Sequence, residues 1–114
     1  MESALQIARE NLKKIRMVTE WATVMGYDCP KKFARKFKNH FGERPLKVLN
    51  LLKLIKAIQL LRATDKKVYE IGCCELCIGD EKRFYQFIKY HTDYSPREIR
   101  DMADTEVIKI VEKL

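Results

Sequence analysis

The side chains in this sequence that could do chemistry are mostly cations, and they gather in its first part. Residues 1–64 carry 14 Lys or Arg against 5 Asp or Glu, whereas residues 65–114 carry 9 against 11. The 114-residue chain has a formal net charge of +7. A basic segment of this kind favours a polyanionic partner, either nucleic acid or an anionic membrane surface. The alternative is an ordinary lysine-rich face that contacts only water.

Cysteine and histidine offer a second kind of chemistry. Cys74 and Cys77 have the Cys-x-x-Cys spacing of metal sites, with Cys73 beside them. A closed zinc site needs four ligands, and the other candidates lie in distant segments. We therefore expect small buried or half-buried thiols, with a metal or thiol-sensor site as the alternative. Neither His40 nor His91 has a serine and an acid spaced for nucleophilic catalysis, so we predict no catalytic residue, no metal, no cofactor and no enzyme.

The composition indicates a globular helical protein. Hydrophobic residues make up 46% and charged residues 34%, with only 4 Gly and 3 Pro. The sequence has no run of about 18 apolar residues that would span a membrane. Charged residues near Met1 interrupt any signal peptide, and the loose use of cysteine favours a reducing compartment. We therefore expect a cytoplasmic protein.

Helical spacing of apolar residues predicts the elements of the first part. Residues 3–15 carry one apolar stripe with Ser3 as a cap, and a second stripe stops at Gly26. Asp28 as a cap and Pro30 in the first turn then predict a helix over roughly 30–41. Three aromatic residues recur in it every four positions and so share one face: Phe33, Phe37 and Phe41.

Residues 46–62 have an unusual pattern, with a polar side chain at every third position. Because a helix turns about 100° per residue, this polar stripe winds around the helix and the apolar face changes direction. Such a helix can bury its first half against one body and its second half against another. We interpret it as a connector between two subdomains. A membrane-surface helix is the alternative, but it requires a constant apolar face, so we expect no membrane partner.

The later part of the chain repeats the earlier one. The spacing predicts a short helix from Val68, a turn over 77–80 and a helix over roughly 80–92. It also predicts a final helix from Ser95-Pro96, with a break at Asp104-Thr105. At an offset of 51 positions, seven residues of 22–45 match residues of 73–96, most of them in chemical type. The matches include the two histidines, two prolines and Phe33 with Phe84. The chain therefore has two copies of a helix–turn–helix unit joined by a long helix.

This arrangement resembles the DNA-binding domain of the AraC/XylS family of bacterial transcription regulators. The resemblance covers roughly residues 4–100 and rests on several short matches: Gly26-Tyr27, Phe33-Ala34-Arg35, Phe41-Gly42, Leu60-Leu61, Ile71-Gly72, Ile88-Lys89 and Ser95-Pro96-Arg97. It implies an all-α fold with two homeodomain-like three-helix subdomains joined by a long connector helix. We assign residues 1–45 to the first helix–turn–helix unit, 46–63 to the connector, and 64–114 to the second unit with a C-terminal helix.

The second copy departs from the family pattern in three places. Cys77-Ile78 stands where Gly-Phe is usual, Asp93 stands where Gly is common, and residues 72–77 contain one extra residue. Asp tolerates left-handed backbone better than most residues. The first copy is closer to the pattern, although the connector has Lys53 where Arg is usual. These departures and the nearby acids favour weaker DNA binding by the second unit.

The predicted DNA contacts lie on the second helix of each copy, which in such units enters the major groove. They are Lys31, Lys32, Ala34, Arg35 and Lys38 in the first copy and, by resemblance, Glu81, Lys82, Arg83, Tyr85, Gln86 and Lys89 in the second. Arg35 can make a two-pronged contact with guanine, whereas Lys31 and Lys38 suit phosphates. Gln86 can pair with adenine and Glu81 can accept from cytosine.

The sequence therefore predicts a DNA-binding transcription regulator. The two helices would enter adjacent major-groove segments of duplex DNA, and one chain could read an asymmetric site as a monomer. The alternative is a regulatory adaptor that acts through protein contact, for example with RNA polymerase, and whose second unit has lost DNA binding.

Overall fold

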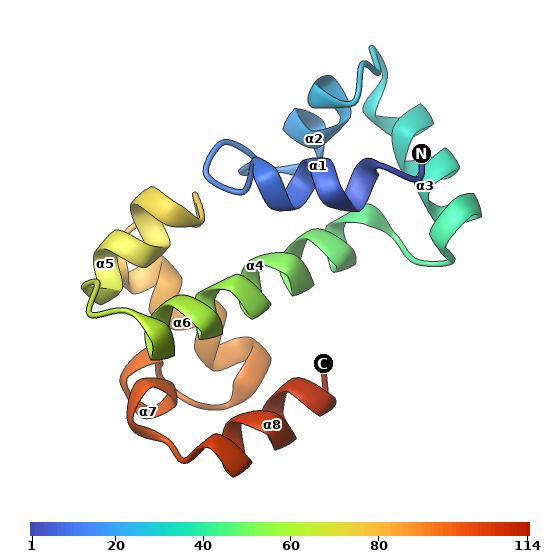
Figure 1. The fold of residues 1–114 in the computed structure, drawn as a ribbon. Helices are drawn as coiled ribbons and strands as arrows, with labels where there is room; N and C mark the ends of the chain where they lie inside the picture. The colour runs from blue at the N-terminus through green and yellow to red at the C-terminus, as the bar shows by residue number, and fades with distance from the viewer. The chain divides into compact units, whose positions relative to one another are not determined.

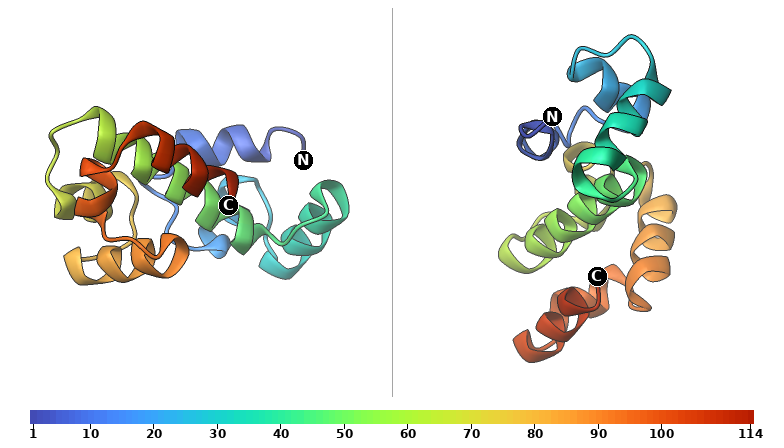
Figure 2. Two further views of the ribbon diagram at one scale, coloured as in Figure 1. Left: turned by 90° about the horizontal axis from the view of Figure 1, so that it is seen from below. Right: turned by 90° about the vertical axis from the view of Figure 1, so that its right-hand side faces the viewer.

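The computed structural model describes residues 1–114, and all its regular structure is helical (Figures 1 and 2). The all-α prediction is thus confirmed. The chain divides into two compact units, Met1–Lys53 and Leu54–Leu114. The boundary falls inside the long helix α4 (Pro45–Ala63), whose first half belongs to unit 1 and whose second half belongs to unit 2. No helix combines the length and the hydropathy that a membrane-spanning segment needs.

Unit 1 contains α1 (Ala4–Glu10), α2 (Val18–Val24) and α3 (Pro30–Phe41) before α4 begins. Gly26 and Gly42 follow α2 and α3 with φ of +84° and +80°, as expected of residues that end helices in left-handed backbone. The predicted cap of α3 is wrong, because Cys29 and not Asp28 occupies its N-cap. Ser3 occupies the N-cap of α1 as predicted, but its side chain makes no cap hydrogen bond. The helix expected over 3–15 ends at Glu10.

Three aromatic rings form the centre of unit 1. Trp21, Phe33 and Phe37 are fully buried. The Trp21 ring meets the rings of Phe33 and Phe37 edge-on, with centroids 5.4 and 5.0 Å apart. Trp21 Nε1 donates to the carbonyl oxygen of Ala4 at 3.3 Å, which joins α1 to this core. Phe41 lies on the same side of α3, 4.5 Å from Phe37 by ring centroids, but is half exposed.

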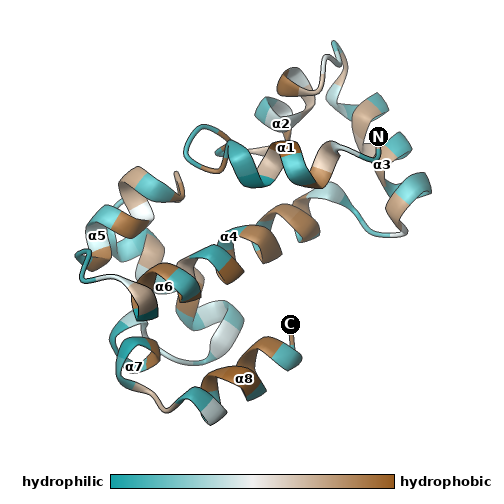
Figure 3. Ribbon diagram, viewed as in Figure 1, coloured by the Kyte–Doolittle hydropathy of each residue, from teal (hydrophilic) through white to brown (hydrophobic).

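The buried side of α4 changes along its length, as its polar pattern predicted. Leu49 is buried in unit 1, and Leu54, Ala57 and Leu61 are buried in unit 2. Apolar residues run along most of the helix in Figure 3. Lys53 is an exception to the polar stripe, because it is only 4% exposed and its Nζ donates to the carbonyl oxygen of Arg16 at 3.3 Å. Burial of this cation is supported by its backbone partner.

Unit 2 continues with α5 (Val68–Glu70), the π-helical turn η1 (Ile71–Glu75), α6 (Glu81–Thr92), α7 (Pro96–Asp101) and α8 (Asp104–Glu112). The π-helix holds one more residue per turn than an α-helix would, so η1 accommodates the extra residue of this copy. Cys77 has φ of +54° at the position equivalent to Gly26, and Asp93 has +66° at the position equivalent to Gly42. The predicted break lies two residues earlier, at Met102-Ala103.

Gly72 sets the packing of η1 on α6. A Cβ atom at this position would lie 2.6 Å from both Cβ and Cγ of Phe84, which is fully buried on α6. Only glycine permits an approach this close. The start of α6 is fixed separately, because Asp80 accepts a hydrogen bond from the backbone N–H of Arg83 at 2.9 Å.

Two arginines connect the ends of α4 and α7 by hydrogen bonds to backbone carbonyl oxygens. Arg62 donates to the carbonyl oxygens of Ile99 and Met102 at 2.9 and 2.6 Å and pairs with Asp104. Arg100 donates in return to the carbonyl oxygens of Leu61 and Lys66 at 2.8 and 2.5 Å. Carbonyls in the last turn of a helix have no partner within the helix. Each arginine therefore caps the helix that the other comes from.

The cysteine prediction is wrong in part. Cys73 and Cys74 are exposed, as is Cys29, and only Cys77 is half-buried. The cause is η1, whose π-turn places Ile71 and Gly72, rather than the two cysteines, against the core of unit 2. No group of three or more His, Cys, Asp or Glu side chains is arranged to hold a metal ion.

Candidate nucleic-acid interface

Helix α3 presents a basic face opposite its buried face. Successive residues are about 100° apart, so Arg35 lies about 180° from the direction midway between Phe33 and Phe37. Lys31, Lys32, Arg35 and Lys38 are exposed, and Ala34 is half-buried at the edge of this face. The structure thus brings all five predicted residues of the first copy onto one side of one helix.

Helix α6 repeats this arrangement 51 positions later. Phe84 and Ile88 are fully buried, and Gln86 takes the outward position of Arg35. Tyr85 is 47% exposed at the position of Ala34. The remaining predicted residues of this copy are all exposed and belong to α6: Glu81, Lys82, Arg83, Gln86 and Lys89. Both predicted sets therefore lie on accessible helix surfaces, each within its own unit.

The two faces differ in charge. The outward face of α3 carries four cations and no acid, whereas Asp80 and Glu81 stand at the beginning of α6. Lys36 belongs to α3 but not to its outward face, since its Nζ lies over the Tyr27 ring, 5.7 Å from the centroid. Cations at the N-terminal end of α3 also act on Cys29. Backbone N–H groups of Lys32 and Lys31, with smaller help from their charges, hold the pKa of its thiol below the ordinary value.

The two histidines occupy equivalent positions near the ends of the two helices. His40 and His91 lie in the last turns of α3 and α6. The His91 ring packs edge-on against Phe87 with centroids 4.7 Å apart, and burial lowers the pKa of His91. Neither ring has a serine or carboxylate hydrogen-bond partner among the contacts of the structure.

Sequence reasoning missed two positions on these faces. Asn39 and Tyr90 are exposed one turn after Arg35 and Gln86, and Tyr90 is 84% exposed. The spacing of four residues was the available signal, because residues i and i+4 share a helix face. Tyr90 meets only the edge of the His91 ring, with centroids 5.1 Å apart.

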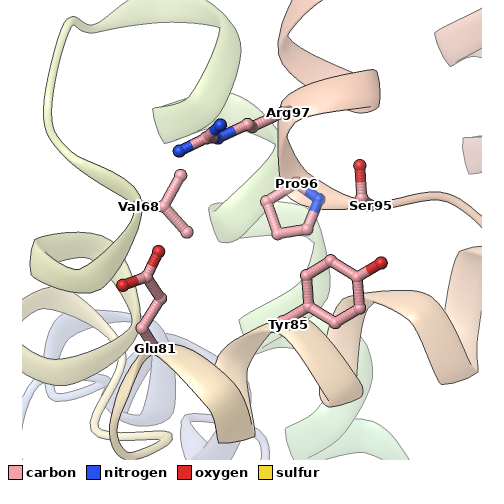
Figure 4. Close-up of a pocket in the computed structure, with 6 residues that line it drawn as sticks. All are labelled: Val68, Glu81, Tyr85, Ser95, Pro96 and Arg97. Atoms are coloured by element: carbon pink, nitrogen blue, oxygen red, sulfur yellow. The ribbon is translucent and has the colours of Figure 1, made fainter.

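A hollow lies beside each of the two helices. In unit 1 a hollow of about 440 Å³ is bounded by residues preceding and opening α2 and α4, together with Ala34. In unit 2 a hollow of about 280 Å³ is bounded by Val68, Glu81, Tyr85 and the start of α7 (Figure 4). Residues far apart in sequence form both, so no local pattern could have predicted them.

Comparison with known proteins places this arrangement in a family. A family model described as a helix-turn-helix domain matches residues 30–102. The HTH-type transcriptional activator RhaS of Enterobacter sp. (strain 638) is 40% identical over 73 residues, which are 64% of this chain and 26% of RhaS. RhaS of Salmonella arizonae is 40% identical over 70 residues, 61% of this chain and 25% of that protein. The chain thus spans about a quarter of the length of these curated relatives.

Solved structures share the fold. A transcriptional regulator of the AraC-type DNA-binding domain-containing proteins, from Chromobacterium violaceum, superposes with a TM-score of 0.72 at 26% identity, covering 88% of both chains. The DNA-binding domain of AdpA, solved in complex with a target DNA, gives 0.75 at 21% identity, again covering 88% of both chains. The relatives are transcription regulators and not enzymes. This chain accordingly belongs to the AraC-type family of helix–turn–helix transcription regulators and corresponds to its DNA-binding domain.

Proposed function

We propose that this chain binds duplex DNA sequence-specifically and regulates transcription by inserting α3 and α6 into adjacent major-groove segments. The observation that carries the proposal is the recurrence, 51 positions apart, of an outward helix face opposite a buried one. The names of RhaS as a transcriptional activator and of AdpA in complex with a target DNA support it. We retain the division into a first unit over 1–45, a connector over 46–63 and a second unit over 64–114 for this function.

In unit 1, Arg35 reads a base and its neighbours fix the register. Arg35 is at the centre of the outward face, where a two-pronged contact with guanine O6 and N7 is possible. Lys31, Lys32 and Lys38 flank it and contact phosphates, which add affinity but no sequence information. Ala34 lies at the edge of the face, close to the hollow.

In unit 2, an amide and a carboxylate take over the reading. Gln86 replaces Arg35 and pairs with adenine, while Glu81 accepts from cytosine N4. Lys82, Arg83 and Lys89 supply phosphate contacts, and Tyr85 stands at the position of Ala34. Unit 2 carries eleven Lys or Arg and eleven Asp or Glu, so its phosphate attraction is weaker than that of unit 1.

The equal numbers of basic and acidic residues in unit 2 favour a second candidate function. In it, unit 1 alone binds DNA while unit 2 contacts a protein such as RNA polymerase. The absence of net charge on unit 2 is the observation in its favour, since a protein contact needs no excess of cations.

In vitro selection from a random duplex library, at two salt concentrations, distinguishes the candidates. The proposal predicts a motif with two half-sites about ten base pairs apart, read by a monomer. Arg35→Ala relaxes one half-site at a cost of about 1–3 kcal/mol and Gln86→Ala relaxes the other. Lys36→Ala is the matched control, because Lys36 lies about 100° around α3 from Arg35, over the Tyr27 ring. A single half-site supports the second candidate, and binding without any motif refutes both.

A further inference from the structure

We infer that the hollow of unit 1 is a binding site for one phosphate of the DNA backbone, held by Arg16 and Arg44. The inference rests on the proposed function and adds residues that neither the sequence pattern nor the helix faces assign. Both arginines are exposed, and both line the hollow together with Ala34 at the edge of the α3 face. A DNA strand lying along α3 would therefore pass beside this hollow.

Two backbone donors near this hollow are already used within the protein. The backbone N–H groups of Arg16 and Met17 already donate to Glu20 Oε1, each at 3.2 Å. The carbonyl oxygen of Arg16 accepts from Lys53. No carboxylate pairs with either guanidinium among the ion pairs of the structure. Guanidinium groups bind phosphate with two parallel hydrogen bonds, which suits this position.

Charge explains why two arginines are needed. Glu20 places one negative charge next to Arg16. One guanidinium offsets this carboxylate, and the second leaves a net positive charge for the phosphate. Most of the remaining lining is apolar, including Met17, which is 47% exposed, and Leu46, which is 57% exposed, and Thr19 adds a hydroxyl. An apolar wall of this kind fits the sugar next to a phosphate.

The equivalent hollow of unit 2 serves as a natural comparison. Five of its six residues stand 51 positions after residues of the unit 1 hollow: Met17, Ala34, Arg44, Pro45 and Leu46. Ser95 replaces Arg44, and the carboxylate of Glu81 faces the hollow across from Arg97 (Figure 4). The same position in the fold therefore carries no net charge in unit 2, and we expect it to hold phosphate only weakly.

The test measures salt dependence of DNA binding by fluorescence anisotropy, using a labelled 30-base-pair duplex of random sequence and the duplex obtained by selection. Arg16→Ala and Arg44→Ala should each reduce the slope of log affinity against log salt by up to about 0.9. The loss of affinity between 50 and 200 mM salt should then shrink by up to about 3.5-fold per arginine. The selected motif should stay unchanged. Arg9→Ala, an exposed arginine of α1 in the same unit, is the control.

If Arg16→Ala and Arg44→Ala give the same slope of log affinity against log salt as Arg9→Ala, the inference is overturned. A selected motif would still support the proposed function in that case. Absence of any motif would refute the proposed function, but the random duplex would still test the hollow. Replacement of single phosphates by neutral methylphosphonates avoids reliance on variants. Replacement of one phosphate beside the half-site of unit 1 should weaken DNA binding by the wild-type protein. The same replacement should leave DNA binding by the Arg16→Ala, Arg44→Ala double variant unchanged. If no single replacement weakens the wild type, the inference is wrong.

Discussion

Replacing Gly72 with alanine should destabilise unit 2, although alanine is the better helix former. A Cβ atom at position 72 would lie 2.6 Å from Cβ and Cγ of Phe84. Carbon atoms in contact are normally about 3.5–4.0 Å apart, so the overlap is about 1 Å. Both Phe84 atoms are next to its backbone, and a rotamer change cannot move Cβ away. Relief therefore requires η1 or α6 to shift.

Two opposing contributions determine the expected change in the free energy of unfolding of Gly72→Ala. Overpacking of a filled core costs about 1–3 kcal/mol, and an overlap against atoms close to the backbone belongs at the upper end. The change from glycine to alanine inside a helical turn returns up to about 1 kcal/mol. We therefore expect a net loss of about 2 kcal/mol in the free energy of unfolding.

Urea unfolding followed by far-ultraviolet circular dichroism measures this loss. Cys73→Ala is the matched control, because Cys73 is the next residue of η1 and is exposed. A Gly72→Ala protein as stable as the control, or more stable, would refute the close packing of η1 on α6. The same shift should weaken DNA binding through unit 2, because α6 carries its outward face.

Three further perturbations follow from the structure. Phe37→Ala should cost about 3–5 kcal/mol of stability because the ring is fully buried. The fluorescence of the neighbouring Trp21 should then report unfolding at a lower urea concentration. An unchanged urea midpoint would contradict the assigned faces of α3. Arg100→Ala should cost about 1–3 kcal/mol, since it leaves the Leu61 carbonyl in the last turn of α4 and the Lys66 carbonyl in the following loop without their donor. The exposed Arg97→Ala is the control, and equal midpoints would show that these hydrogen bonds contribute nothing. Burial lowers the pKa of His91 below its ordinary 6.5, so the unfolded chain binds the proton more tightly and stability should fall as pH drops below about 6.5. The His91→Gln variant should lose less stability than the wild type between pH 7 and 5. Identical curves of unfolding free energy against pH for the two proteins would refute this role of His91.

Helices with strong local signals could be predicted from the sequence. Pro30, Gly42 and the four-residue spacing of phenylalanines define α3 without any tertiary information, and the bounds of this helix were predicted correctly. The repeat then transferred the same pattern to α6, including left-handed backbone at Asp93. These signals are strong because they act within one or two helical turns.

Features that depend on packing between distant residues could not be predicted. Lys53 follows the polar pattern of α4, but it is buried because the Arg16 carbonyl lies close to it in the fold. The exposure of Cys73 follows from a π-turn, whose position depends on the contact between Gly72 and Phe84. The hollow of unit 1 likewise brings together loops almost thirty residues apart.

Changing the distance between the two half-sites tests whether α3 and α6 of one chain read the same face of one duplex. Insertion of about five base pairs between the selected half-sites rotates one of them by half a helical turn. If the two helices do so, affinity falls to that of a duplex with a single half-site. Unchanged affinity after the insertion would show that the two helices do not read DNA together.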